Sequence, residues 1–210
     1  MSARMGRAAR AGLLVAVLLI GGVGFLAVDM LNHGISTRRE PRAAEAFVAT
    51  RLRRLAIPRA ARNLGNPEPA SPEAIREGMA HLADHCASCH GNDGKGTTDI
   101  GRNLYPKAPD MTAPGTQGLS DGELFYIIKN GVRFTGMPAW GDGSPEADRD
   151  SWRLVRFLRH LPRITAQELE EMKDLNPISP EEIREQEEEK RFLEGEKQTS
   201  SPPVTTHAHH

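Results

Sequence analysis

Hydrophobic positions begin with one unbroken run and continue as short helical stripes. From Ala11 to Val28 no residue is charged, and Arg4, Arg7 and Arg10 precede this run. Eighteen apolar residues just reach the length that a membrane-spanning helix needs. We predict an uncleaved membrane anchor in residues 1–32. A secretory signal peptide is the competing interpretation, although its apolar region is usually shorter and ends in small residues; either segment would export the rest of the chain.

A basic stretch comes after the apolar run. Residues 42–57 place apolar side chains loosely at helical intervals, and Pro58 ends the pattern. This helix is either solvated or an amphipathic stretch that rests on anionic headgroups. Residues 63–70 contain Pro67 and Pro69 and are typical of a linker. We therefore predict a basic juxtamembrane helix and linker over residues 33–70.

The next helix begins with strong sequence signals. Ser71 is a candidate N-cap, and Pro72 stands at the first helical position. Ile75, Met79 and Leu82 lie on one face, with Cys86 next along it. Gly78 in the interior costs about 1 kcal/mol relative to alanine. A close helix crossing would explain a glycine there.

The rest of the domain shows helices separated by glycine- and proline-rich loops. Residues 91–118 lack strand-like alternation, and Ser120 with Glu123 forms a capping box for a helix that ends at Asn130-Gly131. A loop over 132–143 leads to an amphipathic helix from about Glu146 to Leu161. Because no strand–helix–strand unit is visible, we predict an all-α fold with its domain at residues 71–162.

The C-terminal part is acidic. Capping boxes at Thr165 and Ser179 predict two helices, and their low apolar content is typical of a solvated arm over residues 163–197. Residues 198–210 have the composition of a disordered tail. The histidines of this tail could bind copper or nickel, or have no role; they are His207, His209 and His210.

Composition adds two constraints. The 27 basic and 28 acidic residues give a net charge of −1, which argues against a nucleic-acid-binding protein. The charge is divided, however, since residues 1–62 carry +8 and residues 63–210 carry −9. Cysteine occurs only at Cys86 and Cys89, so a framework of several disulfides is excluded.

The two cysteines belong to the sequence Cys86-Ala-Ser-Cys89-His90, which has the spacing of covalent haem attachment. On a helix, residues three apart share a face, so two thiols can bond one porphyrin while His90 turns to the iron. A thioredoxin-like dithiol would need a helix start beside parallel strands. A zinc site would need four ligands, and the motif supplies three at most.

A second haem-iron ligand is predicted at Met137. It lies in Gly136-Met137-Pro138, where glycine allows a close backbone approach to the porphyrin and proline restricts the turn. Methionine opposite histidine raises the reduction potential of haem iron. Met111 and Met79 remain the alternatives. For His81, His85 and His160 we expect no iron ligation.

These motifs resemble the class I c-type cytochromes, above all the small bacterial domains found as subunits of respiratory oxidases. The resemblance covers residues 71–162 and includes Asn130-Gly131 and Gly136-Met137-Pro138. It implies three or four helices around one covalent haem c, with Gly78 against Trp152 or Phe157. One departure is Gly101-Arg102, where such domains commonly have Gly-Pro. The sequence therefore does not decide which backbone carbonyl accepts a hydrogen bond from the second ring nitrogen of His90.

Three functions are considered. The leading expectation is a membrane-anchored electron carrier, not an enzyme, at the outer side of the cytoplasmic membrane. Its partners would be redox proteins at the membrane and, through the N-terminal helix, the lipid bilayer. The alternative is a haem subunit fixed in a larger oxidase or dehydrogenase. A haem peroxidase or gas sensor would require an open iron, which a Met137 ligand would block.

Overall fold

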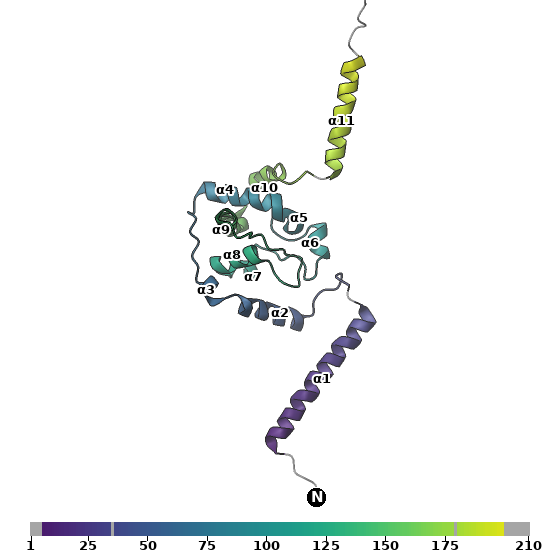
Figure 1. Cartoon of the computed structure of the whole chain (residues 1–210), viewed down its shortest axis with the longest axis vertical. Helices are drawn as coiled ribbons and strands as arrows, with labels where there is room; N and C mark the ends of the chain where they lie inside the picture. The colour runs from purple at the N-terminus through teal and green to yellow at the C-terminus, as the bar shows by residue number, and fades with distance from the viewer. Residues whose placement is uncertain (1–5, 35, 179, 200–210) are drawn as a thin grey trace, which may run out of the picture.

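The protein is a helical domain with one helix extending from each end (Figure 1). The computed structural model describes residues 6–34, 36–178 and 180–199, and it contains no strand in those ranges. The segment before the domain forms α1 (Arg7–His33), α2 (Ala43–Ala56) and α3 (Arg59–Arg62). The domain contains α4 (Pro72–His81), η1 (Leu82–Cys86), α5 (Ala87–His90), α6 (Asp99–Asn103), α7 (Pro114–Gln117), α8 (Asp121–Asn130), α9 (Pro145–His160) and η2 (Leu161–Arg163), followed by α10 (Ala166–Lys173) and α11 (Pro180–Thr199).

The N-terminal helix α1 is apolar over its whole length. Residues Ala8–Asn32 have a mean hydropathy of 2.6, and none of them is buried within the protein. Because apolar side chains on an isolated helix are stable only out of water, this helix has the length and composition of a membrane span. A signal sequence near the N-terminus would have the same properties.

The domain is organised around the crossing of α4 and α9, which make the most extensive helix contact. Gly78 permits this crossing, because a Cβ atom there would lie 2.2 Å from the carbonyl oxygen of Arg153 and 2.9 Å from Cβ of Phe157. The expected contact with Phe157 is thus confirmed. The other nearest atoms belong to the backbone of Arg153, so Trp152 is not the residue that meets Gly78.

Apolar side chains of α4, α8 and α9 fill the space around this crossing. Phe157, Leu82 and Leu161 are fully buried, and the rings of Phe125 and Trp152 stack 4.1 Å apart. The helix ends agree with the sequence signals. Ser71, Ser120 and Ser144 each accept a hydrogen bond from a backbone N–H in the first turn. The capping box at Ser120 is complete.

Arginines of α9 hold the segment that precedes the domain. Arg153 pairs with Glu68 at 3.1 Å, and Arg156 donates to the carbonyl of Glu68 at 2.9 Å. Asn66 donates to the carbonyl of Trp152 at 2.9 Å. Residues 63–70 carry no regular helix, as a linker should. Because their backbone and side chains are bonded to α9, they run along the domain surface.

Two parts of the structure differ from the sequence pattern. The loop predicted over 91–118 contains the short helices α6 and α7; Thr98 caps α6, and Pro114 opens α7. The acidic arm was expected to be solvated, yet Met172 of α10 is fully buried in the core. Thr165 forms the predicted capping box. Ser179, the predicted cap of α11, lies outside the described residues, as does the tail 200–210.

Replacing Gly78 by alanine tests the crossing. The added Cβ would overlap the backbone of Arg153, and such overpacking costs about 1–3 kcal/mol, more than the gain in helix propensity returns. We expect Gly78→Ala to lower the free energy of unfolding in denaturant titration, by up to about 2 kcal/mol after the propensity gain of about 1 kcal/mol is subtracted. Gly115→Ala is the control, because no atom lies within 4 Å of its Cβ. Equal stability of the two variants would contradict the close crossing.

Candidate functional site

The cysteine motif lies at the end of the first domain helix. After α4 the chain widens into a π-helical turn, Leu82–Cys86, and then returns to α-helix over Ala87–His90. Such turns shift the direction of the side chains beyond them and occur often at functional sites. Cys86 packs partly buried against the core cluster. Both cysteines are free thiols, so the motif does not form a disulfide.

The environment of Cys86 disfavours thiolate chemistry. Burial raises the pKa of the thiol to about 12, with smaller contributions in the same direction from Cys89 and Asp84. Redox-active dithiols instead need a lowered pKa, since the thiolate is the reacting form. This surrounding speaks against the thioredoxin-like alternative. Within the described ranges, no three His, Cys, Asp or Glu side chains come together as a metal-binding group.

His90 is held in an environment that favours its neutral form. Burial lowers the pKa of the ring, while the backbone of Pro109 acts in the opposite direction and more weakly. The Nδ1 atom is buried and makes no hydrogen bond of ordinary geometry. A neutral imidazole is the metal-binding form. The backbone of Pro109, in the Pro109-Asp110-Met111 segment, is therefore the group that acts on the ring of His90, and it answers which carbonyl lies at this histidine.

The loop after the motif packs on the backbone of the motif itself. Gly96 donates to the carbonyl of His90 at 2.7 Å, and the Thr98 hydroxyl donates to the carbonyl of Cys89 at 3.0 Å. A Cβ atom at Gly101 would lie 2.2 Å from that same Cys89 carbonyl. Although Arg102 stands where such domains commonly have proline, Gly101 is present at the position where the chain passes close to the Cys89 carbonyl. These contacts fix the carbonyl end of α5.

Met137 lies in a loop whose backbone is bonded at both ends. Val132 donates to the carbonyl of Met137 at 3.1 Å, and Met137 donates to Oγ1 of Thr135 at 3.1 Å. A Cβ at Gly136 would lie 2.6 Å from the side chain of Leu104. Gly136 was expected to allow a close approach to the porphyrin. Among protein atoms, it is the side chain of Leu104 that lies too close to leave room for a Cβ atom at this position.

Burial separates the candidate methionines. Met79 and Met111 are buried in the core, where each fills apolar space. Met137 is half-buried and lies against the same core from a loop. Of the three candidate methionines, Met137 is therefore the one whose thioether is not enclosed by the core. Next to it, Phe134 is fully exposed and adopts a left-handed conformation with φ of 61°, which is uncommon outside glycine.

An aromatic contact brings the methionine loop and the cysteine motif together. His85, directly before Cys86, stacks on Trp140, three residues after Met137, with ring centroids 5.3 Å apart. His81 meets His85 edge to face at 4.8 Å. His160 is bonded to Glu168 at 2.8 Å. The helix end that carries the cysteine motif and the loop that carries Met137 thus meet at His85 and Trp140, although His90 and Met137 are 47 residues apart in sequence.

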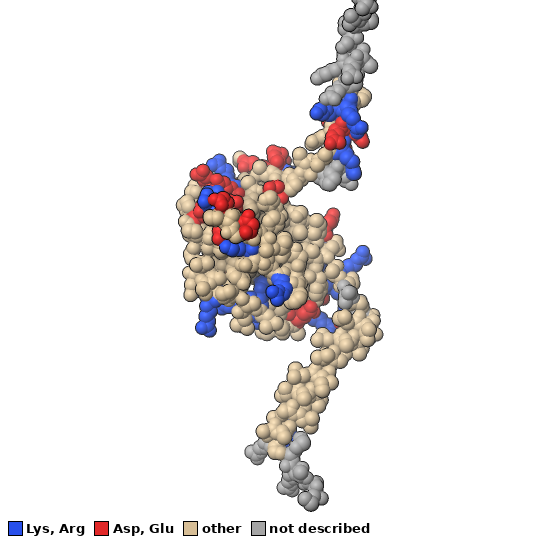
Figure 2. Space-filling view, viewed as in Figure 1, with Lys and Arg blue, Asp and Glu red and all other residues tan. Residues whose placement is uncertain are grey.

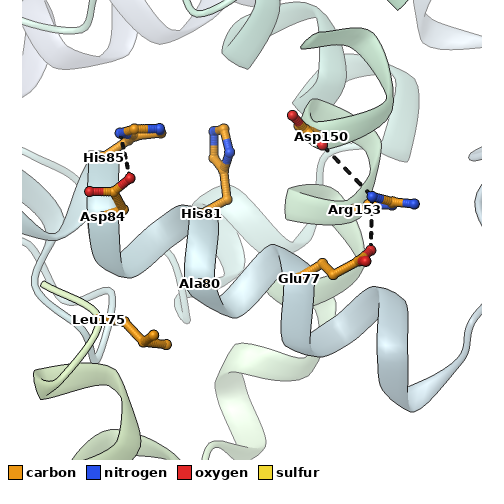
Figure 3. Close-up of a pocket in the computed structure, with 8 residues that line it drawn as sticks. All are labelled: Glu77, Ala80, His81, Asp84, His85, Asp150, Arg153 and Leu175. Carbon is orange, nitrogen blue, oxygen red and sulfur yellow. Dashed lines mark ion pairs between the residues drawn. The ribbon is translucent and has the colours of Figure 1, made fainter. Parts of the chain in front are cut away.

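A surface hollow of about 410 Å³ lies beside this region, between α4 and α9. Figure 3 shows the rings of His81 and His85 projecting to the same side, with Arg153 paired to Glu77 and Asp150. None of the predicted haem ligands lines this hollow. It is lined largely by polar and charged side chains, and it is separate from the cysteine motif and from Met137.

The residues present fit a covalently attached haem. Two free thiols occupy the attachment spacing, and the ring of His90 follows directly after them with the Pro109 backbone at its side. A half-buried thioether stands on a neighbouring loop. This donor set of two thiols, one imidazole and one thioether matches a histidine–methionine haem c. The tail histidines considered for metal binding, His207, His209 and His210, lie outside the described residues.

Comparison with known proteins gives the same assignment. Residues 73–158 match the family described as cytochrome c oxidase, cbb3-type, subunit III. The cbb3-type cytochrome c oxidase subunit FixP of Rhizobium meliloti (strain 1021) is 35% identical over 72 residues, and so is FixP of Sinorhizobium medicae (strain WSM419). In each case the match covers 34% of this chain and 23% of the relative.

The chain thus spans about a quarter of the length of the curated relatives that it matches. The matched region begins in α4 and ends in α9, so it includes the motif, the methionine loop and the helix crossing. Residues 73–158 therefore form a class I c-type cytochrome domain, whose prosthetic group is covalently bound haem c.

Proposed function

We propose that the protein is the haem subunit of a membrane-bound respiratory oxidase and carries single electrons within that complex. The observation that carries the proposal is the match of residues 73–158 to cbb3-type oxidase subunit III. An independent electron shuttle was the leading expectation from the sequence. The comparisons favour the alternative, a subunit of a larger complex, because the relatives that match are themselves named as oxidase subunits.

In this proposal four residues hold the prosthetic group. Cys86 and Cys89 form the two thioether bonds, His90 is the proximal iron ligand and Met137 is the distal one. The neutral ring of His90 beside the Pro109 backbone and the half-buried position of Met137 support these roles. When bound, the haem supplies one-electron chemistry at its iron. The protein supplies the ligands and a low-dielectric surrounding from the core of α4, α8 and α9.

The protein is proposed to be a single-pass protein of the cytoplasmic membrane with the haem domain on its outer side. The apolar helix α1 supports the anchor. Arginines flank it on both sides and do not decide the orientation. The outer side is proposed from the covalent haem chemistry of residues 73–158. The division into 1–32, 33–70, 71–162, 163–197 and 198–210 remains a prediction, with the extension 163–197 as the arm for a partner.

Covalent attachment is tested by removing the thiols. Because thioether bonds survive denaturation, the wild-type protein should keep about one haem per chain after acid acetone extraction or under denaturing electrophoresis. Cys86→Ser combined with Cys89→Ser should remove this covalent haem completely. Loss of haem from the wild-type protein on extraction would overturn the assignment of these residues.

Methionine ligation separates an electron carrier from an open-site haem protein. The wild-type spectrum should be six-coordinate and low-spin, and carbon monoxide should bind the reduced protein poorly. Met137→Ala should open the site, lower the reduction potential and permit carbon monoxide binding, since methionine favours the reduced iron. Met111→Leu is the control because it conserves core volume and should leave the spectrum unchanged. Ready binding of carbon monoxide by the wild type would favour a peroxidase or sensor.

Membership of a complex is tested by purification. After gentle detergent extraction of membranes, the tagged full chain should co-purify with other oxidase subunits, and the preparation should reduce oxygen when supplied with electrons. The Met137→Ala variant should still co-purify, because Met137 lies in a loop of the haem domain, while its oxygen reduction falls. A full chain that always migrates alone and exchanges electrons freely would favour the independent shuttle.

A further inference from the structure

Helix α2 presents an apolar face that no described part of the protein covers. Positions 47, 48, 52 and 55 share one side of the helix, and their side chains are highly exposed. The exposed fractions are 62% for Phe47, 52% for Val48, 60% for Leu52 and 73% for Leu55. An exposed row of large apolar side chains of this kind marks an interaction surface.

A few polar side chains elsewhere on α2 contact the haem domain. Arg53 is half-buried and interacts with the charge of Glu123 on α8. Glu45 accepts a hydrogen bond from the hydroxyl of Tyr105, and Arg54 donates to the carbonyl of Gly118 at 3.4 Å. These contacts place the side of α2 that carries Arg53 toward the domain, and they leave the apolar side turned away from it.

The outward side of α2 also carries a positive charge. Arg51 lies on this side, with its guanidinium 5.1 Å from the centre of the Phe47 ring. Glu45 is the one acidic residue in the sequence of α2, and it is bonded to Tyr105 on the domain. On the face of the domain that Figure 2 shows, most of the visible carboxylates lie away from α2 and α1. Apolar residues interleaved with arginine suit anionic headgroups.

Position along the chain indicates what this face meets. Helix α2 begins ten residues after the apolar helix α1 ends at His33. Asp29 near the end of α1 pairs with Arg42 at 2.6 Å, and the Arg42 guanidinium lies 5.1 Å from the ring centre of Phe25. Figure 1 shows α2 between α1 and the rest of the domain. The chain just before α2 is therefore bonded to the apolar helix, and the apolar face of α2 lies close to α1 along the chain.

We propose that α2 lies in the plane of the membrane surface, with Phe47, Val48, Leu52 and Leu55 among the lipids and Arg51 at anionic headgroups. The haem domain then rests on the bilayer through α2. This proposal uses the membrane insertion of α1 but is independent of any oxidase partner, so it can be tested on the protein alone.

The experiment uses the full chain in vesicles of phosphatidylcholine and phosphatidylglycerol. Leu52→Cys carries a small fluorescent label, and Ile100→Cys is the matched control, because Ile100 is a similarly exposed aliphatic residue of the haem domain. Phospholipids with a nitroxide near the headgroup should quench the label at position 52 roughly two-fold or more and leave that at 100 unchanged. Quenching is expressed as the ratio of fluorescence with and without nitroxide lipids. Quenching by the haem lowers both values of this ratio and therefore cancels.

Equal quenching at positions 52 and 100 would overturn the proposal. A label at 52 that is shielded from water yet not quenched by nitroxide lipids would also overturn it, in favour of a protein partner or a second copy. Omitting phosphatidylglycerol should weaken the quenching, and an unchanged ratio would remove the role given to Arg51. Labelling of the chain without an introduced cysteine would instead show free Cys86 or Cys89 and count against the proposed haem attachment.

Discussion

The contact of α4 with α9 at Gly78 is the constraint on which the remaining structure depends. Because no side chain separates the helices there, the carbonyl of Arg153 lies directly against α4. This position of α4 sets where its continuation places Cys86, Cys89 and His90. The same contact aligns α9 so that its apolar side meets α8 and its arginines reach outward.

The arginines of helix α9 then form ion pairs and hydrogen bonds with several other segments of the chain. Arg153 pairs with Glu68 before the domain and with Glu77 on α4. Arg159 pairs with Asp121 at the start of α8 and donates to the carbonyl of Gln117, each at 2.8 Å. Guanidinium groups suit this task because they offer several donors in a fixed plane. One helix therefore bonds to segments that are distant from one another in sequence.

The main helices of the domain could be predicted from local signals, since caps and 3.6-residue periodicity act within a few residues. Ser71 and Ser120 mark helix starts that the structure retains, and the helix predicted from about Glu146 begins at Pro145. The burial of Met172 was not visible, because an acidic helix with few apolar residues gives no periodic signal. Helices α6 and α7 were missed because four or five residues are too short to show a period.

For the candidate site, the residues themselves could be predicted from the sequence. The contacts that hold those residues in place could not. The cysteine spacing and the Gly-Met-Pro loop are local patterns. The stacking of His85 on Trp140, the approach of Leu104 to Gly136 and the effect of Pro109 on His90 all join distant parts of the chain. Such contacts arise only once the α4–α9 crossing has formed, so no short window of sequence contains them.

The bonded linker has a mechanical consequence. A free chain of residues 57–70 would let a tethered domain swing through a wide volume and meet partners by diffusion. Here Asn66 and Glu68 are bonded to α9, and Ser120 donates to the carbonyl of Arg62 at 2.9 Å. Residues 57–70 thus move with the domain instead of acting as a flexible tether. The domain's range of motion is smaller than such a tether would allow.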